Sequence, residues 1–169
     1  PLSEISRTKV QLSARILGAS KRSYDDEFDI DFPSTMRIQK YQSVLDWYRN
    51  PENMDYKKSL EIDVAGVPHS FGWGGVHGAR DKYMGEGFFI NMDVASLYPS
   101  LMINYDLLSR SCNPRKFKDI VDLRLKYKAE KNPLQAPLKI VINGTYGASK
   151  DKFNPLYDPR QATRVCIYG

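Results

Sequence analysis

A carboxylate that is followed closely by a tyrosine and a proline is the clearest chemical signal in this sequence. Asp93 follows the apolar run 87–90, and Tyr98 is fixed in place by Pro99. This pattern predicts a buried strand that ends at the carboxylate and turns sharply into a helix. Such a turn leaves backbone N–H groups without partners, so they can bind an anion beside the carboxylate. The stretch therefore suits a metal-bound phosphate.

A second group of polar residues lies in the basic part of the sequence. Residues 1–109 have a net charge of −3, whereas residues 110–169 carry 13 basic and 5 acidic side chains, a net charge of +8. A one-sided excess of lysine and arginine is typical of proteins whose partner is rich in phosphate. The alternative is a solvated helix face. Arg124 and Lys128 are four residues apart and would be neighbours on one such face.

The stretch 139–147 is compatible with two local structures, and its own residues do not decide between them. Asn143 and Gly144 follow a β-branched run, which is the strongest short signal for a hairpin turn. In a helix, by contrast, Lys139, Asn143 and Tyr146 would stand at positions i, i+4 and i+7. The helix would therefore place a cation, an amide and an aromatic ring on one face.

Glycines and aromatic residues alternate between residues 71 and 75. Four of the seven residues 72–78 are glycines, which weaken a strand and often mark the close approach of a backbone to another molecule. One interpretation is a nucleic-acid strand whose bases stack on Phe71 and Trp73, while its phosphates reach the amides of Gly74 and Gly75. The alternative, with equal weight, is a bulged hairpin in which the glycines form turns.

Hydrophobic periodicity predicts the elements that must position these groups. Apolar residues at helical spacing predict helices over residues 3–17, 36–48 and 117–131. Strict alternation predicts a strand over 60–64, and the apolar run before Asp93 predicts another over 88–92. The acidic stretch 22–34 is expected to be a solvated linker.

Composition excludes several classes of protein. The chain of 169 residues is long enough for a proper core, and it contains no run of 18 apolar residues and no charged-then-apolar leader. We therefore expect neither a membrane span nor a secretory signal. Cys112 and Cys166 lie far apart without a metal-ligand spacing, so a reduced, intracellular protein is expected. Because the first residue is Pro1, the chain is expected to be an excised piece.

Two motifs together give the sequence a recognisable pattern. Residues 93–100 match the DxxSLYPS motif A of family B DNA polymerases, and residues 139–147 match the KxxxNxxYG motif B. The order of the motifs and the basic helix between them match as well. Residues 71–75 are similar to the YxGG-type element of these enzymes, with Gly72 in place of the tyrosine. The sequence thus resembles a family B DNA polymerase, and its short fingers look like those of phage or prophage replicases.

The resemblance implies an α+β fold, in the form of a partial polymerase palm and a short two-helix fingers hairpin. An antiparallel palm sheet is expected over residues 60–93, and a two-helix fingers hairpin would pair the helix 117–131 with one over 136–149, so that the Asn-Gly pair lies inside a helix. A further helix would begin at Pro159. The implied division of the chain is an N-terminal helical segment, a palm part with motif A, the fingers with motif B, and the start of a return helix, at residues 1–58, 59–112, 113–150 and 151–169.

The resemblance also implies roles for individual residues. Asp93 would be the catalytic carboxylate and would bind two Mg²⁺ ions, with the Val94 carbonyl as a second oxygen ligand. Tyr98 would pack beneath the sugar and exclude a ribose 2′-hydroxyl. The implied nucleotide-binding residues are Ala95, Ser96, Leu97, Tyr98, Arg124, Lys128, Lys139 and Asn143, and the implied contacts with DNA or the nascent base pair are Tyr146, Gly147, Phe71, Trp73, Gly74 and Gly75.

The implied activity is DNA-directed DNA synthesis, in which a primer 3′-OH attacks a deoxynucleoside triphosphate. The family also needs a second carboxylate from a YxDTD motif C, which does not occur in this sequence. We therefore expect this fragment of the polymerase to be inactive by itself. Its implied partners are primer-template DNA and deoxynucleoside triphosphates, with no membrane, in the cytoplasm of a bacterial or phage-infected cell.

Two other classes of function stay open at this point. A non-catalytic module that binds nucleic acid or nucleotide would explain the basic half and the glycine-aromatic loop. A different two-metal enzyme, such as a nuclease, would need a cluster of two or three acids, and only Asp93 stands at a convincing strand end. If the chain is part of a polymerase palm, the exposed surface of the incomplete palm is expected to favour a dimer or an aggregate.

Overall fold

The structure, a computed structural model, describes Leu17 and residues 37–169. It contains a three-stranded antiparallel sheet and helices, so the predicted α+β class is confirmed. The predicted helix 3–17, apart from Leu17, and the predicted linker 22–34 lie outside the described residues. The elements in chain order are α2 (Gln42–Arg49), η1 (Pro51–Asn53), β1 (Ser59–Val64), β2 (Val67–Gly72), β3 (Gly75–Gly78), α3 (Leu97–Asn104), α4 (Pro114–Ala129), α5 (Gln135–Lys150) and α6 (Pro159–Tyr168).

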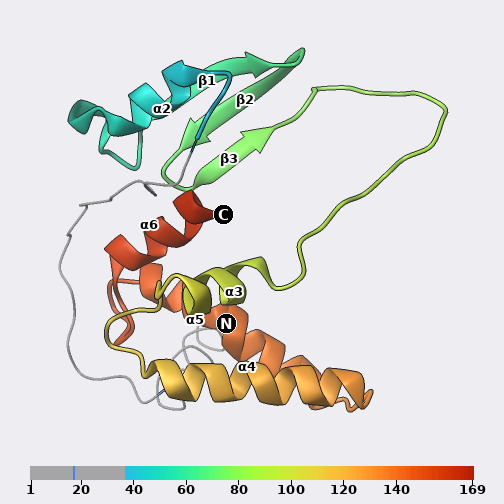
Figure 1. Ribbon diagram of the computed structural model, residues 1–169, viewed down its shortest axis with the longest axis vertical. Coiled ribbons are helices and arrows are strands. Elements are labelled where there is room, and N and C mark those ends of the chain that lie inside the picture. The colour runs from blue at the N-terminus through green and yellow to red at the C-terminus, as the bar shows by residue number, and fades with distance from the viewer. Residues whose placement is uncertain (1–16, 18–36) are drawn as a thin grey trace, which may run out of the picture.

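The sheet is a meander with the strand order β1-β2-β3, and α2 lies beside it (Figure 1). Strands β2 and β3 are joined by a two-residue turn, because Gly72 pairs with Gly75 across Trp73 and Gly74. Gly75 has a φ of 120°, which a residue with a side chain rarely adopts. The hydroxyl of Tyr48 on α2 donates to the Gly72 carbonyl oxygen at 2.9 Å. The glycine-rich stretch is therefore a tight hairpin that α2 anchors.

The predicted strand 88–92 is not formed. Residues 79–94 contain neither strand nor helix, and Figure 1 shows them as a long excursion between β3 and α3. The Phe88 side chain is fully exposed, and Ile90 and Met92 are almost as accessible. A strand needs a neighbour for its backbone N–H and C=O groups, and no strand among the described residues pairs beyond β3. The predicted self-association through exposed palm surface stays a prediction.

The helices α3 to α6 form the larger core of the described chain. Its buried residues include Leu101 on α3, Phe117 on α4 and Ile142 on α5. α4 begins with Asn113 as its N-cap, whose side chain accepts from the Lys116 N–H, and it is joined to α5 by residues 130–134. The predicted helices 117–131 and 136–149 are therefore confirmed, with both starting slightly earlier than expected.

The Asn143–Gly144 pair lies inside α5, so the hairpin alternative for this stretch is wrong. Ile142, Thr145 and Ala148 are buried at a spacing of three residues, which is a helical face packed against the core. The Thr145 hydroxyl also donates to the Val141 carbonyl oxygen one turn earlier, at 3.0 Å. Burial of this face outweighs the low helix propensity of asparagine and glycine, which amounts to about 1 kcal/mol for glycine relative to alanine.

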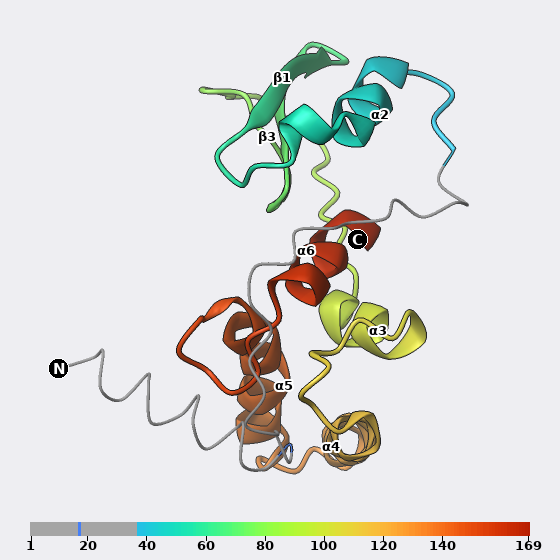
Figure 2. The same cartoon turned by 90° about the vertical axis from the view of Figure 1, so that its left-hand side faces the viewer.

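Helix α6 connects the two parts of the structure, as Figure 2 shows. Its Val165 packs in the core of α3–α5, whereas Ile167 packs with Val44 and Trp73 beside the sheet. The Tyr56 hydroxyl, in the loop before β1, is hydrogen-bonded to the Thr163 hydroxyl of α6. The predicted helix from Pro159 is confirmed, and it holds the sheet part and the helical part together.

Candidate functional site

A cavity of about 580 Å³ lies where the start of α3 meets α4 and α5. Its walls come from three stretches of sequence: the loop before α3 with the first turn of that helix, one face of α4, and one face of α5. The residues that line it are Asp93, Ala95, Ser96, Leu97, Tyr98, Pro99, Arg124, Lys128, Lys139, Asn143 and Tyr146. The fold thus brings the predicted nucleotide-binding residues together around one space.

The wall formed by α3 starts at a sharp turn. Ser96 is the N-cap and has a left-handed backbone with a φ of 57°, so the predicted abrupt entry into a helix is present. The first N–H groups of a helix have no partner within it, and Leu97 and Tyr98 supply two of these groups beside the cavity. This end of α3 therefore presents hydrogen-bond donors and the positive end of a helix dipole.

The opposite walls carry the positive charge. Arg124 and Lys128 lie one turn apart on α4, and Lys139 lies near the start of α5. Arg124 Nη1 donates to Ser96 Oγ at 3.4 Å, which ties α4 to the start of α3. Arg124 Nε is shielded from solvent and has no hydrogen-bond partner among the described residues. With three cations and Asp93 as the one carboxylate among its lining residues, the cavity favours an anion.

Two tyrosines form the remaining wall. The ring centroids of Tyr98 and Tyr146 are 4.5 Å apart, with an angle of 57° between the rings. The Tyr146 hydroxyl is hydrogen-bonded to Cys166 Sγ on α6 at 2.7 Å, and Lys150 Nζ lies 4.7 Å from the centroid of the Tyr146 ring. Burial, followed by the hydrogen bond to Cys166, raises the pKa of Tyr146 well above its ordinary value. Burial also raises the pKa of Tyr98, so both hydroxyls stay neutral at physiological pH.

Two of the predicted site residues that belong to the two motifs, Val94 and Gly147, are not among those that line this cavity. Val94 is exposed next to Asp93, in the loop before α3. Gly147 is exposed on α5 beside Tyr146, and a Cβ atom added there would meet nothing within 4 Å. The predicted roles of these two residues, as a carbonyl ligand and as a close contact for a base pair, stay predictions.

The predicted stacking of a base on Trp73 is wrong for this structure. Its side chain has no exposed surface, and its Nε1 donates to the Asn53 carbonyl oxygen at 2.7 Å. The ring meets Tyr48 edge to face, with the centroids 5.2 Å apart, and also contacts Trp47. Two aromatic residues on α2 therefore make Trp73 the centre of the core beside the sheet.

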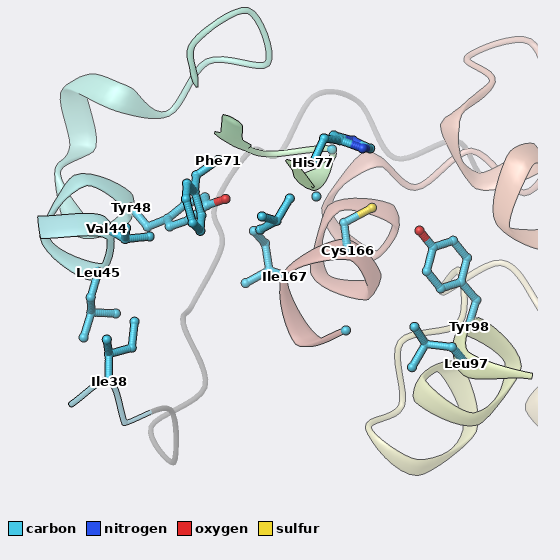
Figure 3. Close-up of a pocket in the computed structure, with 14 residues that line it drawn as sticks. Ile38, Val44, Leu45, Tyr48, Phe71, His77, Leu97, Tyr98, Cys166 and Ile167 are labelled. Atoms are coloured by element: carbon cyan, nitrogen blue, oxygen red, sulfur yellow. The ribbon is translucent and has the colours of Figure 1, made fainter. Parts of the chain in front are cut away.

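The other three predicted DNA contacts in the glycine-aromatic stretch lie at a second, apolar pocket of about 430 Å³. Phe71, Gly74 and Gly75 line it together with residues of α2, α3 and α6 (Figure 3). Phe71 is also partly buried against the Trp73 cluster. Their predicted contact with DNA stays a prediction.

Replacing Trp73 with alanine is expected to lower the free energy of unfolding by about 3–5 kcal/mol, because the change leaves a cavity in a packed core. Chemical denaturation measures this difference. The matched control is Phe153→Ala, since Phe153 is a large, exposed aromatic residue; it should cost less than about 0.5 kcal/mol. A Trp73→Ala protein of unchanged stability that binds DNA more weakly would restore the stacking interpretation.

Sequence reasoning missed residues that support the site from α6 and the end of α5. Cys166 and Lys150 both contact Tyr146, although Cys166 is 20 residues away from it in the sequence. A single cysteine in an ordinary helical pattern carries no signal for such a role. The pairing of Arg110 with Asp158 across 48 residues, described below, was equally invisible.

Asp93 is the one carboxylate among the residues that line the cavity, and this limits the number of metal ions that the cavity can hold. Among the residues that the structure describes, no three His, Cys, Asp or Glu side chains are grouped as metal ligands. Mg²⁺ is commonly bound through one or two carboxylates together with substrate phosphates and waters. Asp93 therefore fits one Mg²⁺ that arrives with a polyphosphate. A pair of ions would need a second carboxylate, which is not among the lining residues.

Comparisons with known proteins leave the family open. No family model, no curated protein and no solved structure matches this chain. Within the described residues, the helices are too short or too polar to cross a lipid bilayer. The site must therefore be interpreted from its own residues and geometry.

Proposed function

We propose that the cavity binds a magnesium-bound deoxynucleoside triphosphate, and that the chain is the nucleotide-binding part of a DNA-directed DNA polymerase similar to those of family B. The observation that carries this proposal is the meeting of three separate segments around one cavity. Asp93 to Tyr98, the Arg124–Lys128 pair and the Lys139–Tyr146 face supply a carboxylate, free amides, cations and aromatic rings to the same space. These are the groups that a nucleoside triphosphate requires.

Each wall of the cavity has a chemical task under this proposal. The N–H groups at the start of α3 and the cations Arg124, Lys128 and Lys139 neutralise the phosphate oxygens and the pyrophosphate that leaves. Tyr98 packs against the sugar, and Asn143 and Tyr146 contact the base. Bound magnesium supplies charge neutralisation at the triphosphate, held at Asp93.

Nucleotidyl transfer needs more than this chain's cavity offers. A two-metal reaction requires a second carboxylate, and Asp93 is the one carboxylate among the lining residues. We therefore propose that the chain binds nucleotide but does not extend a primer by itself. This same observation favours the second candidate function, a nucleotide-binding module without chemistry. A polymerase requires primer-template DNA, whereas a nucleotide-binding module does not. The effect of primer-template DNA on nucleotide affinity therefore distinguishes the two candidate functions.

The experiment is calorimetric titration of the chain with dATP, with Mg²⁺ and then with a chelator, at constant ionic strength. We expect saturable binding that is roughly tenfold tighter with Mg²⁺, because one charge-assisted contact through Asp93 contributes about 1.4 kcal/mol. Asp93→Asn should reduce the affinity with Mg²⁺ to the value measured without it. The monophosphate dAMP should bind far more weakly, since it lacks the charge that the three cations neutralise.

Asp81→Asn is the matched control, because Asp81 is an exposed carboxylate in the same excursion and does not line the cavity. It should leave the affinity with and without Mg²⁺ unchanged. Absence of saturable dATP binding, or equal binding of dATP and dAMP, would refute the nucleotide site. If addition of primer-template DNA leaves dATP affinity unchanged, the module without chemistry is the better description.

A further inference from the structure

We propose that Cys166 is a positioning residue, which holds the Tyr98–Tyr146 wall in place and thereby determines how closely the cavity fits the sugar of a bound nucleotide. This inference rests on the proposed function. It assigns a role to a residue of α6 that lies outside both sequence motifs and does not line the nucleotide cavity.

Cys166 stands where three helices meet. Its Sγ is 2.7 Å from the Tyr146 hydroxyl on α5, and the centroid of the Tyr146 ring lies 4.5 Å from that of the Tyr98 ring on α3. Figure 3 shows the Cys166 and Tyr98 side chains extending into the space between α6 and α3. Lys150 Nζ closes the cluster, 4.0 Å from the thiol. The two rings are therefore tied to α6 by a single side chain.

The open space behind Tyr98 makes the position of its ring dependent on the contacts with Tyr146 and Cys166. Tyr98 lines the nucleotide cavity on one side and the apolar pocket of about 430 Å³ on the other. A ring that is backed by an open pocket is not held by packing on that side, because it lacks contact atoms there. Its position then depends on Tyr146 and Cys166. Without the thiol, the ring can move into the apolar pocket and the cavity becomes wider.

ATP and dATP differ by one hydroxyl group on the sugar. The ratio of their dissociation constants therefore reports how closely the cavity fits the sugar. We expect Cys166→Ala to reduce the ratio of ATP to dATP dissociation constants about fivefold to tenfold, as expected for the loss of one hydrogen bond. Cys166→Ser retains a polar atom at the same place and should keep the ratio within about twofold of the original. Calorimetric titration with both nucleotides in Mg²⁺ gives these ratios.

Two further variants separate positioning from general damage. Cys112→Ala removes the other cysteine, which is buried in the core of α3–α5, and it should leave the ratio unchanged. Tyr146→Phe removes the hydroxyl that meets Cys166 and should reduce the ratio as Cys166→Ala does, with no further reduction when the two are combined. These results would support the proposal.

Other outcomes overturn it. An unchanged ratio in both Cys166→Ala and Tyr146→Phe shows that the thiol does not position the wall. An equal reduction in Cys166→Ala and Cys112→Ala shows that the effect is a general loss of packing. If the chain without any substitution binds neither ATP nor dATP, both the proposed function and this inference are wrong. This outcome differs from the failure of the inference alone, in which the unsubstituted chain still binds nucleotide.

Discussion

Replacing both Arg124 and Lys139 with alanine is expected to weaken the binding of magnesium-bound dATP by about a thousandfold. Each cation would make charge-assisted hydrogen bonds to phosphate oxygens, which contribute about 1.5–3 kcal/mol apiece, and each 1.4 kcal/mol changes an affinity by about tenfold. The two side chains come from different helices, α4 and α5, and line the same cavity, so the double variant removes two separate contacts with one triphosphate. Calorimetric titration at fixed salt concentration measures the loss.

The control for this prediction removes the same charge elsewhere. Lys116 and Lys118 are exposed on α4, and neither lines the nucleotide cavity. The double variant Lys116→Ala/Lys118→Ala should weaken dATP binding by less than about threefold, because exposed charges at a distance are screened by salt. If both double variants lose the same affinity, the attraction is a property of the basic surface and the cavity is not the site.

The second large effect concerns stability. Arg110→Ala is expected to lower the free energy of unfolding by about 3 kcal/mol, because it leaves the carboxylate of Asp158 buried without its cation. The Asp158 side chain is inaccessible to solvent; Oδ1 accepts from Arg110 Nη2 at 2.9 Å and Oδ2 from Arg110 Nε at 3.0 Å. Asp158 also caps α6 by accepting from the Gln161 N–H. Thermal unfolding should show a Tm lower by roughly 6–12 °C.

An exposed ion pair in the same protein provides the comparison. Lys118 Nζ and Asp122 Oδ2 are 3.1 Å apart on the surface of α4. Exposed pairs of this kind contribute about 0.3–0.5 kcal/mol, so Lys118→Ala should change the Tm by no more than about 2 °C. Equal Tm values for Arg110→Ala and Lys118→Ala would mean that the Arg110–Asp158 pair does not stabilise α6.

Local pattern was sufficient for the elements whose signals are local. The apolar spacing after Phe117 predicts α4 because a helix satisfies its backbone within one segment, whereas the helix from Pro159 was expected from the resemblance alone. The strand expected at 88–92 failed because a strand depends on a partner, and the apolar run before Asp93 says nothing about where that partner lies. Whether a strand forms is in this case a property of the whole sheet.

Side-chain environments were predictable only where a motif grouped them. The spacing of Lys139, Asn143 and Tyr146 is compatible with one helical face, and the structure places all three at the cavity. Trp73 looked like a stacking platform because its neighbours are glycines, yet Trp47 and Tyr48 enclose it from α2. Cys166 had no signal at all. The environments of Trp73 and Cys166 are both determined by contacts with residues far away in the sequence.

The central claim is that the cavity between α3, α4 and α5 holds a magnesium-bound deoxynucleoside triphosphate. A titration of the ¹⁵N-labelled chain with dATP and Mg²⁺, followed by amide resonances, tests it residue by residue. The amides of Ser96, Leu97 and Tyr98 should shift and saturate together with those of Lys139 and Asn143, while β1 stays unchanged. Resonances that do not shift, or shifts confined to the apolar pocket beside α2, would contradict the claim.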